Sequence, residues 1–319
     1  MESAPRVSVV LPTYNRAHLL PRALRSVLAQ TYRAFEVLVV DDGSTDETAG
    51  AVAGLADPRI RFHRVNHQGC AGAMNVAIQH ALGEWVAFID SDDEWAPAKL
   101  ERQMQAAAAA GPEVGVIYSA GVIVDDAAGR EIHARRPRAG GQGRVFDLML
   151  ETNWFSFVSV LARRRCFDEV GLFDEGLAFG EDRDWLLRAA RRFEFRGLAE
   201  PLVTVHVHRG PRQTADLAGR IAFAQHILER YREDLGARPL LAARKQVALG
   251  QLCLREGDVA RARRAFAEAM RVRPTFVPAY AHLAISWGPW RLWHSLSRWR
   301  LRRRGRRAVA ALHRQETAP

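Results

Sequence analysis

Short runs of apolar, β-branched residues alternate with stretches of helical spacing through the first third of the chain. The predicted elements are, in order, a strand at Val7–Leu11, a helix at His18–Gln30, strands at Glu36–Val40 and Ile60–Val65, a helix at Ala71–Leu82, a strand at Val86–Ile89 and a helix at Pro97–Ala110. Strands that alternate with helices are typical of βαβ units, in which helices cover both faces of a sheet. The pattern therefore predicts an α/β fold with a mostly parallel central sheet.

A second block of mixed pattern follows. Val114–Val124 and Gly129–His133 predict a hairpin, which turns at Asp125 and Asp126. Further on, the pattern predicts a strand near Phe155–Ala162, a helix at Glu181–Arg192 and a strand near Pro201–Val207. We expect the first domain to end at residue 210.

The pattern beyond residue 210 is helical, and one stretch of it has the spacing of a tetratricopeptide repeat. The residues at that repeat's positions are Leu249, Gly250, Gly257, Ala262, Phe266, Ala269 and Pro274. We therefore expect three parts: a domain over residues 1–210, an α-helical, tetratricopeptide-like region over 211–288, and a tail over 289–319.

The charge of the chain is concentrated in that tail. Forty-six Lys and Arg residues against 36 Asp and Glu residues give a net charge of +10 at pH 7, and residues 291–319 hold nine arginines against Glu316. Trp290, Trp293 and Trp299 fall on one side of a predicted helix with arginines mostly opposite, which suits the interface of an anionic membrane. The alternative is that these tryptophans cover the helical region while the arginines stay solvated. The near-neutral remainder gives no case for a nucleic-acid partner.

We expect a cytoplasmic protein. No secretory signal follows Met1, and apolar runs such as Val114–Val124 are far short of the roughly 20 residues that a membrane span needs. The three cysteines, Cys70, Cys166 and Cys253, match no metal-ligand spacing and fit the free thiols of a reducing compartment. We assign them no role, and we interpret lone histidines such as His67 as structural.

Acidic residues gather where successive predicted strands end. Asp41 and Asp42 follow the second strand, and Asp90, Asp92 and Asp93 follow the fourth. Open α/β sheets bind ligands at the carboxyl ends of their strands, and crowded carboxylates repel one another unless a cation or a donor-rich ligand neutralises them. The spacing of Asp90 and Asp92 directs both side chains to one side, where hard oxygen ligands suit Mg²⁺ or Mn²⁺ shared with a diphosphate. The alternative is that these residues are helix caps and turn residues.

Several motifs that occur in register resemble one enzyme family. They are Val7-Ser8-Val9-Val10-Leu11-Pro12-Thr13-Tyr14-Asn15-Arg16, Gln30-Thr31-Tyr32, Val39-Val40-Asp41-Asp42-Gly43-Ser44-Thr45-Asp46 and Asp90-Ser91-Asp92-Asp93. In their order and intervals, the chain resembles the nucleotide-diphosphosugar glycosyltransferases of family 2 across Val7–Arg209. The resemblance implies a Rossmann-like A-type glycosyltransferase fold and a nucleotide-diphosphate sugar as the donor.

The resemblance also implies a role for each motif in holding that donor. The implied donor-binding residues are Pro12, Thr13 and Tyr14 at the border of the base, Asn15 and Arg16 near it, Asp42 at the base edge or ribose, Asp90 at the ribose or metal, and Asn75 and Ser91. Asp92, together with Asp90, would ligate the Mg²⁺ or Mn²⁺ that bridges the two phosphates. His208 and Arg209 are implied to form a basic loop against the diphosphate.

The family's catalytic carboxylate lies in a Glu-Asp pair that opens a helix, and Glu181-Asp182 has that form. By the resemblance, Asp182 is the general base that takes the proton of the acceptor hydroxyl, and Glu181 positions the acceptor. The alternative is an acidic first turn that complements the helix dipole. The implied reaction is direct displacement with inversion, in which cationic groups stabilise the departing diphosphate.

These observations predict a metal-dependent, inverting glycosyltransferase. It would move a sugar, preferably from a UDP-sugar, to a hydroxyl of a glycan or lipid-linked glycan in cell-surface polysaccharide synthesis. Its tail would attach it to the inner face of the cytoplasmic membrane. The alternative from another class is a non-catalytic sugar-nucleotide-binding protein or a scaffold protein of the tetratricopeptide type.

Overall fold

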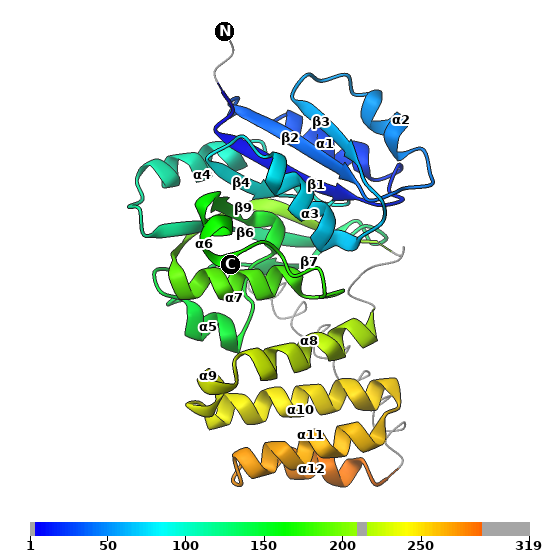
Figure 1. Ribbon diagram of the computed structural model, residues 1–319, viewed down its shortest axis with the longest axis vertical. Helices are drawn as coiled ribbons and strands as arrows, with labels where there is room; N and C mark the ends of the chain where they lie inside the picture. Colours follow the sequence, from blue (N-terminus) through cyan, green and yellow to red (C-terminus); the bar gives the residue numbers. More distant parts are fainter. Residues whose placement is uncertain (1–3, 209–215, 289–319) are drawn as a thin grey trace, which may run out of the picture. The chain divides into compact units, whose positions relative to one another are not determined.

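The structure is a computed structural model that describes residues 4–208 and 216–288. The chain divides into two compact units, Met1–Pro211 and Arg212–Pro319 (Figure 1). Arg209 and the tail, for which the sequence makes predictions, lie outside the described residues.

A nine-stranded sheet organises the first unit. Its strands lie in the order β3-β2-β1-β4-β8-β6-β9-β5, and β7 pairs with β6. The bounds are β1 Val7–Thr13, β2 Phe35–Asp41, β3 Ile60–Arg64, β4 Trp85–Phe88, β5 Glu94–Trp95, β6 Val114–Asp125, β7 Arg130–Arg135, β8 Leu161–Arg163 and β9 Glu194–Val207. The strands from β3 to β4 are parallel neighbours, β8 is antiparallel to β4 and β6, and β6 is parallel to β9. The half of the sheet built before residue 90 is therefore parallel, as expected, and the other half is mixed.

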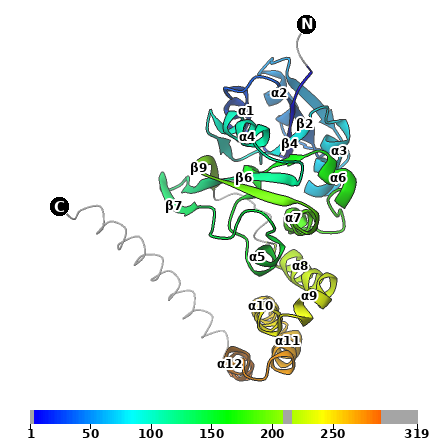
Figure 2. The same ribbon diagram turned by 90° about the vertical axis from the view of Figure 1, so that its left-hand side faces the viewer.

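Helices cover both faces of this sheet (Figure 2). They are α1 Leu20–Leu28, α2 Thr48–Ala53, α3 Gly69–His80, α4 Lys99–Ala108, α5 Phe146–Glu151, α6 Arg165–Val170 and α7 Glu181–Arg192, with a 3-10 helix at Phe157–Ser159. Val7, Val9 and Leu11 of β1 share a buried core with Leu20 and Leu24 of α1. α3 packs on the opposite face of β1 and β2. This division follows from the strand geometry, because successive side chains of a strand point to opposite faces.

One predicted strand is wrong. In the stretch Phe155–Ala162, only the end belongs to β8, and Phe157–Ser159 forms the 3-10 helix. Phe155, Val158, Val160 and Leu161 are nevertheless buried. The partly buried Phe157 lies in an aromatic cluster, with its ring centroid 4.7 Å from that of Phe88 and 5.8 Å from that of Phe173. Most of the run is therefore apolar because its side chains pack in the interior, and only its end pairs as a strand.

The described part of the second unit is helical. Its helices are α8 Leu217–Arg230, α9 Arg232–Gly236, α10 Pro239–Glu256, α11 Val259–Val272 and α12 Val277–Ile285. α10 ends at Gly257, whose φ of +99° favours glycine, and Asp258 then caps α11 by accepting a hydrogen bond from Arg261 N at 2.8 Å. Gly250 of α10 lies against the fully buried Phe266 of α11. The residues at tetratricopeptide spacings thus form a helix pair, and its assignment to that repeat stays a prediction.

None of the helices within 4–208 and 216–288 combines the length and the hydropathy that crossing a membrane requires.

Candidate functional site

The loops that follow β1, β2 and β4 meet at one edge of the sheet, because these strands are parallel neighbours. The end of β9 reaches the same edge, where the His206 N–H donates to Asp93 Oδ1 at 2.9 Å. Residues far apart in the sequence therefore surround one site.

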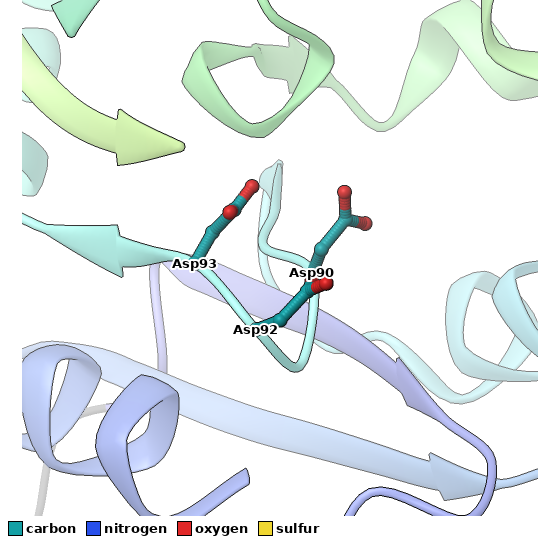
Figure 3. Close-up of side chains that lie close together, drawn as sticks. All are labelled: Asp90, Asp92 and Asp93. Atoms are coloured by element: carbon teal, nitrogen blue, oxygen red, sulfur yellow. The ribbon is translucent and has the colours of Figure 1, made fainter. Parts of the chain in front are cut away.

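Three carboxylates of the loop after β4 form the acidic part of the site (Figure 3). Asp90, Asp92 and Asp93 each offer an oxygen, and these oxygens all lie within 4.8 Å of one another. Asp90 is exposed, Asp92 is partly buried and Asp93 is buried. Carboxylate oxygens are the ligands that Mg²⁺ and Mn²⁺ prefer, so this donor set fits a divalent cation.

The electrostatics of Asp90 also fit a cation. Protein atoms crowd its carboxyl although it is open to solvent, and this desolvation, followed by the charges of Asp92, Asp182 and Glu181, raises its pKa to about 7. Because four carboxyl groups repel one another here, a divalent cation would stabilise their ionised forms. The same contributions show that the structure brings Asp182 and Glu181 close to Asp90.

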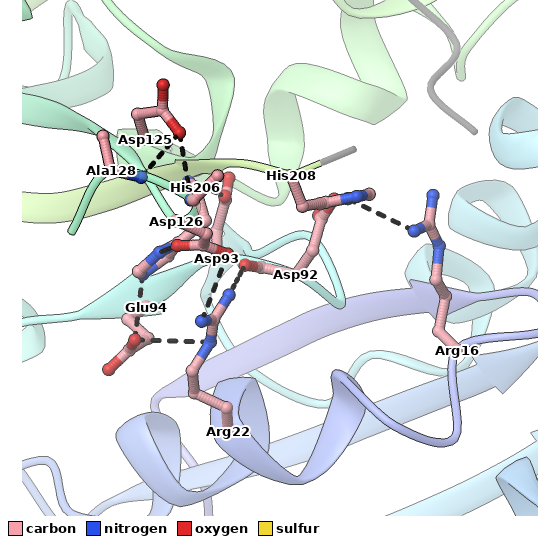
Figure 4. A network of polar contacts seen from close by, with 11 residues as sticks. Arg16, Arg22, Asp92, Asp93, Glu94, Asp125, Asp126, Ala128, His206 and His208 are labelled. Atoms are coloured by element: carbon pink, nitrogen blue, oxygen red, sulfur yellow. Dashed lines mark hydrogen bonds and ion pairs between the residues drawn. The ribbon is translucent and has the colours of Figure 1, made fainter. Parts of the chain in front are cut away.

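His208 lies directly against this acidic loop (Figure 4). Its Nε2 is 2.8 Å from Asp92 Oδ2 and 3.3 Å from Arg16 Nη1. An imidazole nitrogen at this position can hold a cation jointly with Asp92 or face an anionic ligand. His208 is therefore at the predicted site, beside the predicted residue Arg16.

A stacked aromatic pair borders the other side of the site. The Tyr14 ring, 43% exposed, stacks on His67 with centroids 4.3 Å apart and planes at 28°. His67 Nδ1 lies 2.8 Å from Asp42 Oδ2, and the Asp42 carboxylate also accepts hydrogen bonds from Gln68 N at 2.8 Å and Gly69 N at 3.0 Å. Asp42 thus fixes the start of α3 and orients His67, a residue that sequence reasoning left out of the site.

The other residues after β1 join the loops into one surface. Asn15 adopts a left-handed conformation with φ of 52°, accepts from Thr45 N and donates its own N–H to Ser44 Oγ, each at 2.8 Å. Pro12 is partly buried at the end of β1, and the next residue, Thr13, is buried. The Thr13 hydroxyl has no hydrogen-bond partner within the described part of the chain.

Two further predicted donor-binding residues, Asn75 and Ser91, are also buried. Asn75 of α3 is 4% exposed and binds the loop before α7: its amide donates to Phe173 O at 3.0 Å and Glu175 Oε1 at 2.8 Å and accepts from Phe173 N at 2.9 Å. These contacts show Asn75 bracing a loop. Ser91, between Asp90 and Asp92, is buried as well.

The predicted catalytic pair opens α7. Gly180 precedes it with φ of +81°, a conformation that favours glycine, and starts the helix at Glu181. Glu181 is buried and Asp182 is partly buried. Burial raises the pKa of the Asp182 carboxyl, while a backbone hydrogen bond from Arg183 and the charges of Arg183 and Arg135 oppose this. A carboxylate with a raised pKa is better suited to accept a proton.

Cys70 and Arg135 also belong to this site, and sequence reasoning missed both. Burial, followed by the nearby carboxylates of Glu181, Asp90 and Asp182, raises the pKa of the Cys70 thiol well above its usual value. The only signal for Cys70 is its place in the first turn of α3, which begins beside Asp42. No local signal marks Arg135, because 47 residues separate it from Asp182 in the sequence. Only the folded sheet brings the two residues together.

Comparison with known proteins places this fold in a family. The model of glycosyl transferase family 2 matches residues 8–171, just over half of the chain. The succinoglycan biosynthesis protein ExoO of Rhizobium meliloti is 36% identical over 194 residues, which cover 57% of this chain and 55% of that protein. An Escherichia coli protein named UDP-Glc:alpha-D-GlcNAc-diphosphoundecaprenol beta-1,3-glucosyltransferase WfgD is 43% identical over 99 residues, 31% of this chain and 39% of its own. The chain spans between 33% and 65% of the length of several curated relatives that it matches.

Solved structures share the fold. Staphylococcus aureus TarS 1–349 in complex with UDP-GlcNAc has a TM-score of 0.59 at 19% identity, covering 88% of this chain and 89% of that one. The mannosyltransferase PcManGT from Pyrobaculum calidifontis, in complex with GDP-Man and Mn²⁺, has a TM-score of 0.54 at 25% identity, covering 92% and 84%. These matches confirm the predicted A-type α/β fold followed by a helical region.

Proposed function

Because the chain belongs to glycosyl transferase family 2, we propose that it transfers a sugar from a nucleotide-diphosphate sugar to a hydroxyl acceptor with inversion of configuration. One observation carries the proposal. The acidic loop Asp90–Asp93, the stacked pair Tyr14–His67 and the carboxylate of Asp182 lie around a single edge of the sheet. With a bound metal, the acidic loop would hold the donor's diphosphate. The stacked pair would contact its base, and Asp182 would accept the proton of the attacking hydroxyl.

The donor end of the proposal rests on the residues after β1 and β2. The exposed Tyr14 ring offers a face for a base, and Asp42 offers a fixed acceptor beside it. We take a UDP-sugar as the preferred donor, because the E. coli relative is named for UDP-Glc and the S. aureus structure holds UDP-GlcNAc. GDP-sugars are the alternative, since PcManGT binds GDP-Man.

We take the acceptor to be a glycan or a lipid-linked glycan of a cell-surface polysaccharide. The support comes from the names of two relatives, one assigned to succinoglycan biosynthesis and the other to an acceptor linked to diphosphoundecaprenol.

A Mg²⁺ or Mn²⁺ ion, held by Asp90 and Asp92 with His208 beside them, would supply positive charge to the diphosphate as it leaves. The chain's own residues have separate tasks. Asp182 accepts the proton of the acceptor hydroxyl while that oxygen attacks the anomeric carbon and the bond to the diphosphate breaks. Glu181 orients the acceptor, and the Arg16 guanidinium adds a fixed positive charge near His208. No covalent sugar intermediate is needed.

Nucleotide release from UDP-, GDP- and dTDP-sugars with Mg²⁺ or Mn²⁺ tests the proposal. The wild-type protein should release nucleotide from one donor class only when the metal is present. Asp92→Ala should abolish the release, and Asp182→Asn should lower it about 100-fold or more. Asp168→Asn, at an exposed carboxylate of α6, is the matched control and should behave as wild type.

Wild-type rates in both Asp92→Ala and Asp182→Asn would contradict the assignment of the site. Tight binding of a nucleotide sugar without release, even with glycan acceptors present, would instead favour the non-catalytic binding protein.

We also infer that the C-terminal part attaches this enzyme to the cytoplasmic face of an anionic membrane. The basic tail over 289–319 motivates the inference, together with exposed apolar side chains on α12 and in the turn that follows it. Val277 is 73% exposed and Tyr280 is 44% exposed, three residues apart on α12, and Trp287, in the turn after the helix, is 73% exposed. Aromatic and basic groups together suit the interface of a bilayer.

A further inference from the structure

Arg22 lies outside the residues so far given a role, yet its side chain reaches from α1 to the acidic loop (Figure 4). Its Nη2 donates a hydrogen bond to the main-chain oxygen of Asp92 at 2.7 Å. Its Nε lies 3.3 Å from Glu94 Oε1, and its Nη1 lies 3.5 Å from Asp126 Oδ2. One guanidinium thus contacts the acidic loop, the strand that follows it and the turn between β6 and β7.

The same two carboxylates hold His206 of β9. His206 Nδ1 is 2.5 Å from Asp126 Oδ1, and its Nε2 is 2.9 Å from Glu94 Oε1. Its N–H also donates to Asp93 Oδ1. Glu94 and Asp126 therefore bridge Arg22 to His206, which lies two residues before His208.

These contacts form a closed chain of interactions. It runs from the Asp92 main chain to Arg22, through Asp126 and Glu94 to His206, along β9 to His208, and back to the Asp92 side chain at 2.8 Å. Through these contacts, Arg22 fixes the distance between the Asp92 carboxylate and the His208 imidazole.

We propose that Arg22 is a positioning residue that holds Asp92 and His208 at the separation needed to bind the metal and diphosphate. The inference rests on the proposed function. Arg22 also joins α1 to the acidic loop. Because α1 follows the loop of Tyr14 to Arg16, this contact keeps a constant distance between the residues proposed to bind the base and those proposed to bind the metal. A lysine would serve only in part, because a single ammonium lacks the planar fork that meets three acceptors.

Binding of Mn²⁺, followed through the loss of the free Mn²⁺ signal in electron paramagnetic resonance, tests this role without requiring turnover. The full chain is titrated with Mn²⁺ alone and with UDP or GDP present. Arg22→Met should weaken Mn²⁺ binding about 10-fold or more, the usual effect of removing a group that orients a metal ligand. Turnover at saturating Mn²⁺ should stay within about threefold, and Arg22→Lys should weaken binding to a smaller extent.

Arg25→Met is the matched control, because Arg25 is an exposed arginine one turn further along the same helix. It should bind Mn²⁺ as the wild type does. Circular dichroism checks whether each variant is folded. If Arg22→Met does not fold, Arg22→Lys and Glu94→Gln decide the question in the same assay.

Four outcomes decide the inference, and the first two of them leave the proposed function standing. Equal Mn²⁺ affinity in folded Arg22→Met and Arg25→Met would overturn it, as would a loss of turnover at saturating Mn²⁺ with unchanged affinity. No Mn²⁺ binding by the wild type, with or without nucleotide, would contradict the proposed metal site itself and this inference with it. Selective weakening in the Arg22 variants would support both.

Discussion

Lys99 at the start of α4 is fully buried, and its Nζ lies 3.7 Å above the Trp95 ring. Within the described residues this ammonium has no hydrogen-bond partner, and burial lowers its pKa well below the usual value. A buried amine without a hydrogen-bond partner costs stability, which the ring face offsets only in part.

Lys99→Met should therefore raise the free energy of unfolding at pH 7 by about 1–3 kcal/mol. The pH dependence of the free energy of unfolding provides a second test. Because the folded pKa is lowered, the unfolded chain binds a proton that the folded chain lacks, and wild-type stability should gain from this group as the pH rises toward 10. The difference between variant and wild type should shrink over that interval in urea unfolding followed by circular dichroism.

The chain's other lysine provides the control for this measurement. Lys245 is only partly buried, so Lys245→Met should change stability little and with no comparable pH dependence. A Lys99→Met variant that is less stable than wild type at pH 7 would mean that the contact with Trp95 outweighs the cost of burial.

At the scale of single residues, the sequence reveals which side chains are neighbours where one motif carries several chemical groups. Asp90 and Asp92 lie close together because they share one loop, and that was visible in the sequence. Asn75 also fits a motif, but its amide is used by the loop at Phe173, which is far away in the sequence. Cys70 and Arg22 were missed because only tertiary contacts bring them to the site.

At the scale of helices, the pair α10 and α11 depends on one close approach. Gly250 faces the Phe266 ring, and a methyl group at this position would clash with the ring's edge. Gly250→Ala should destabilise the helical region by about 1–3 kcal/mol, because overpacking outweighs the roughly 1 kcal/mol that alanine gains in helix propensity. Thermal unfolding of the full chain by circular dichroism measures the effect.

Gly236→Ala is the matched control, since nothing lies within 4 Å of a methyl group placed at the end of α9. It should leave stability unchanged or raise it slightly. If Gly250→Ala were as stable as Gly236→Ala, the helices would be separated more widely than the structure shows.

Element predictions followed the same physical limits. The long helix α7 was predicted with its observed ends, because an acidic first turn and a periodic apolar face mark it. The helices α2, α5 and α6 have six residues each and were not predicted, since so few residues complete no clear period. The false strand near Phe155 came from apolar residues that serve an aromatic cluster.

At the scale of the whole molecule, charge divides between the two parts of the chain. Residues 1–210 carry 24 Lys and Arg against 28 Asp and Glu, a net charge of −4, whereas residues 211–319 carry 22 against 8, a net charge of +14. The part with the proposed active site is thus mildly acidic, and the helical part and tail are strongly basic. A surface with anionic lipid would attract only the second part, by about 1 kcal/mol for each basic residue near it.

Sedimentation with vesicles tests this division. The full chain should bind vesicles of phosphatidylcholine that contain about 30% phosphatidylglycerol, and deletion of residues 289–319 should release it. Donor hydrolysis in solution should be unaffected, because Asp92 and Asp182 lie in the other unit. Retained binding after the deletion, lost only when Val277, Tyr280 and Trp287 are replaced by serine, would assign attachment to α12 and the turn after it instead of the tail. Binding that survives both changes would contradict a membrane role for either, and the charge asymmetry would then serve another acidic partner.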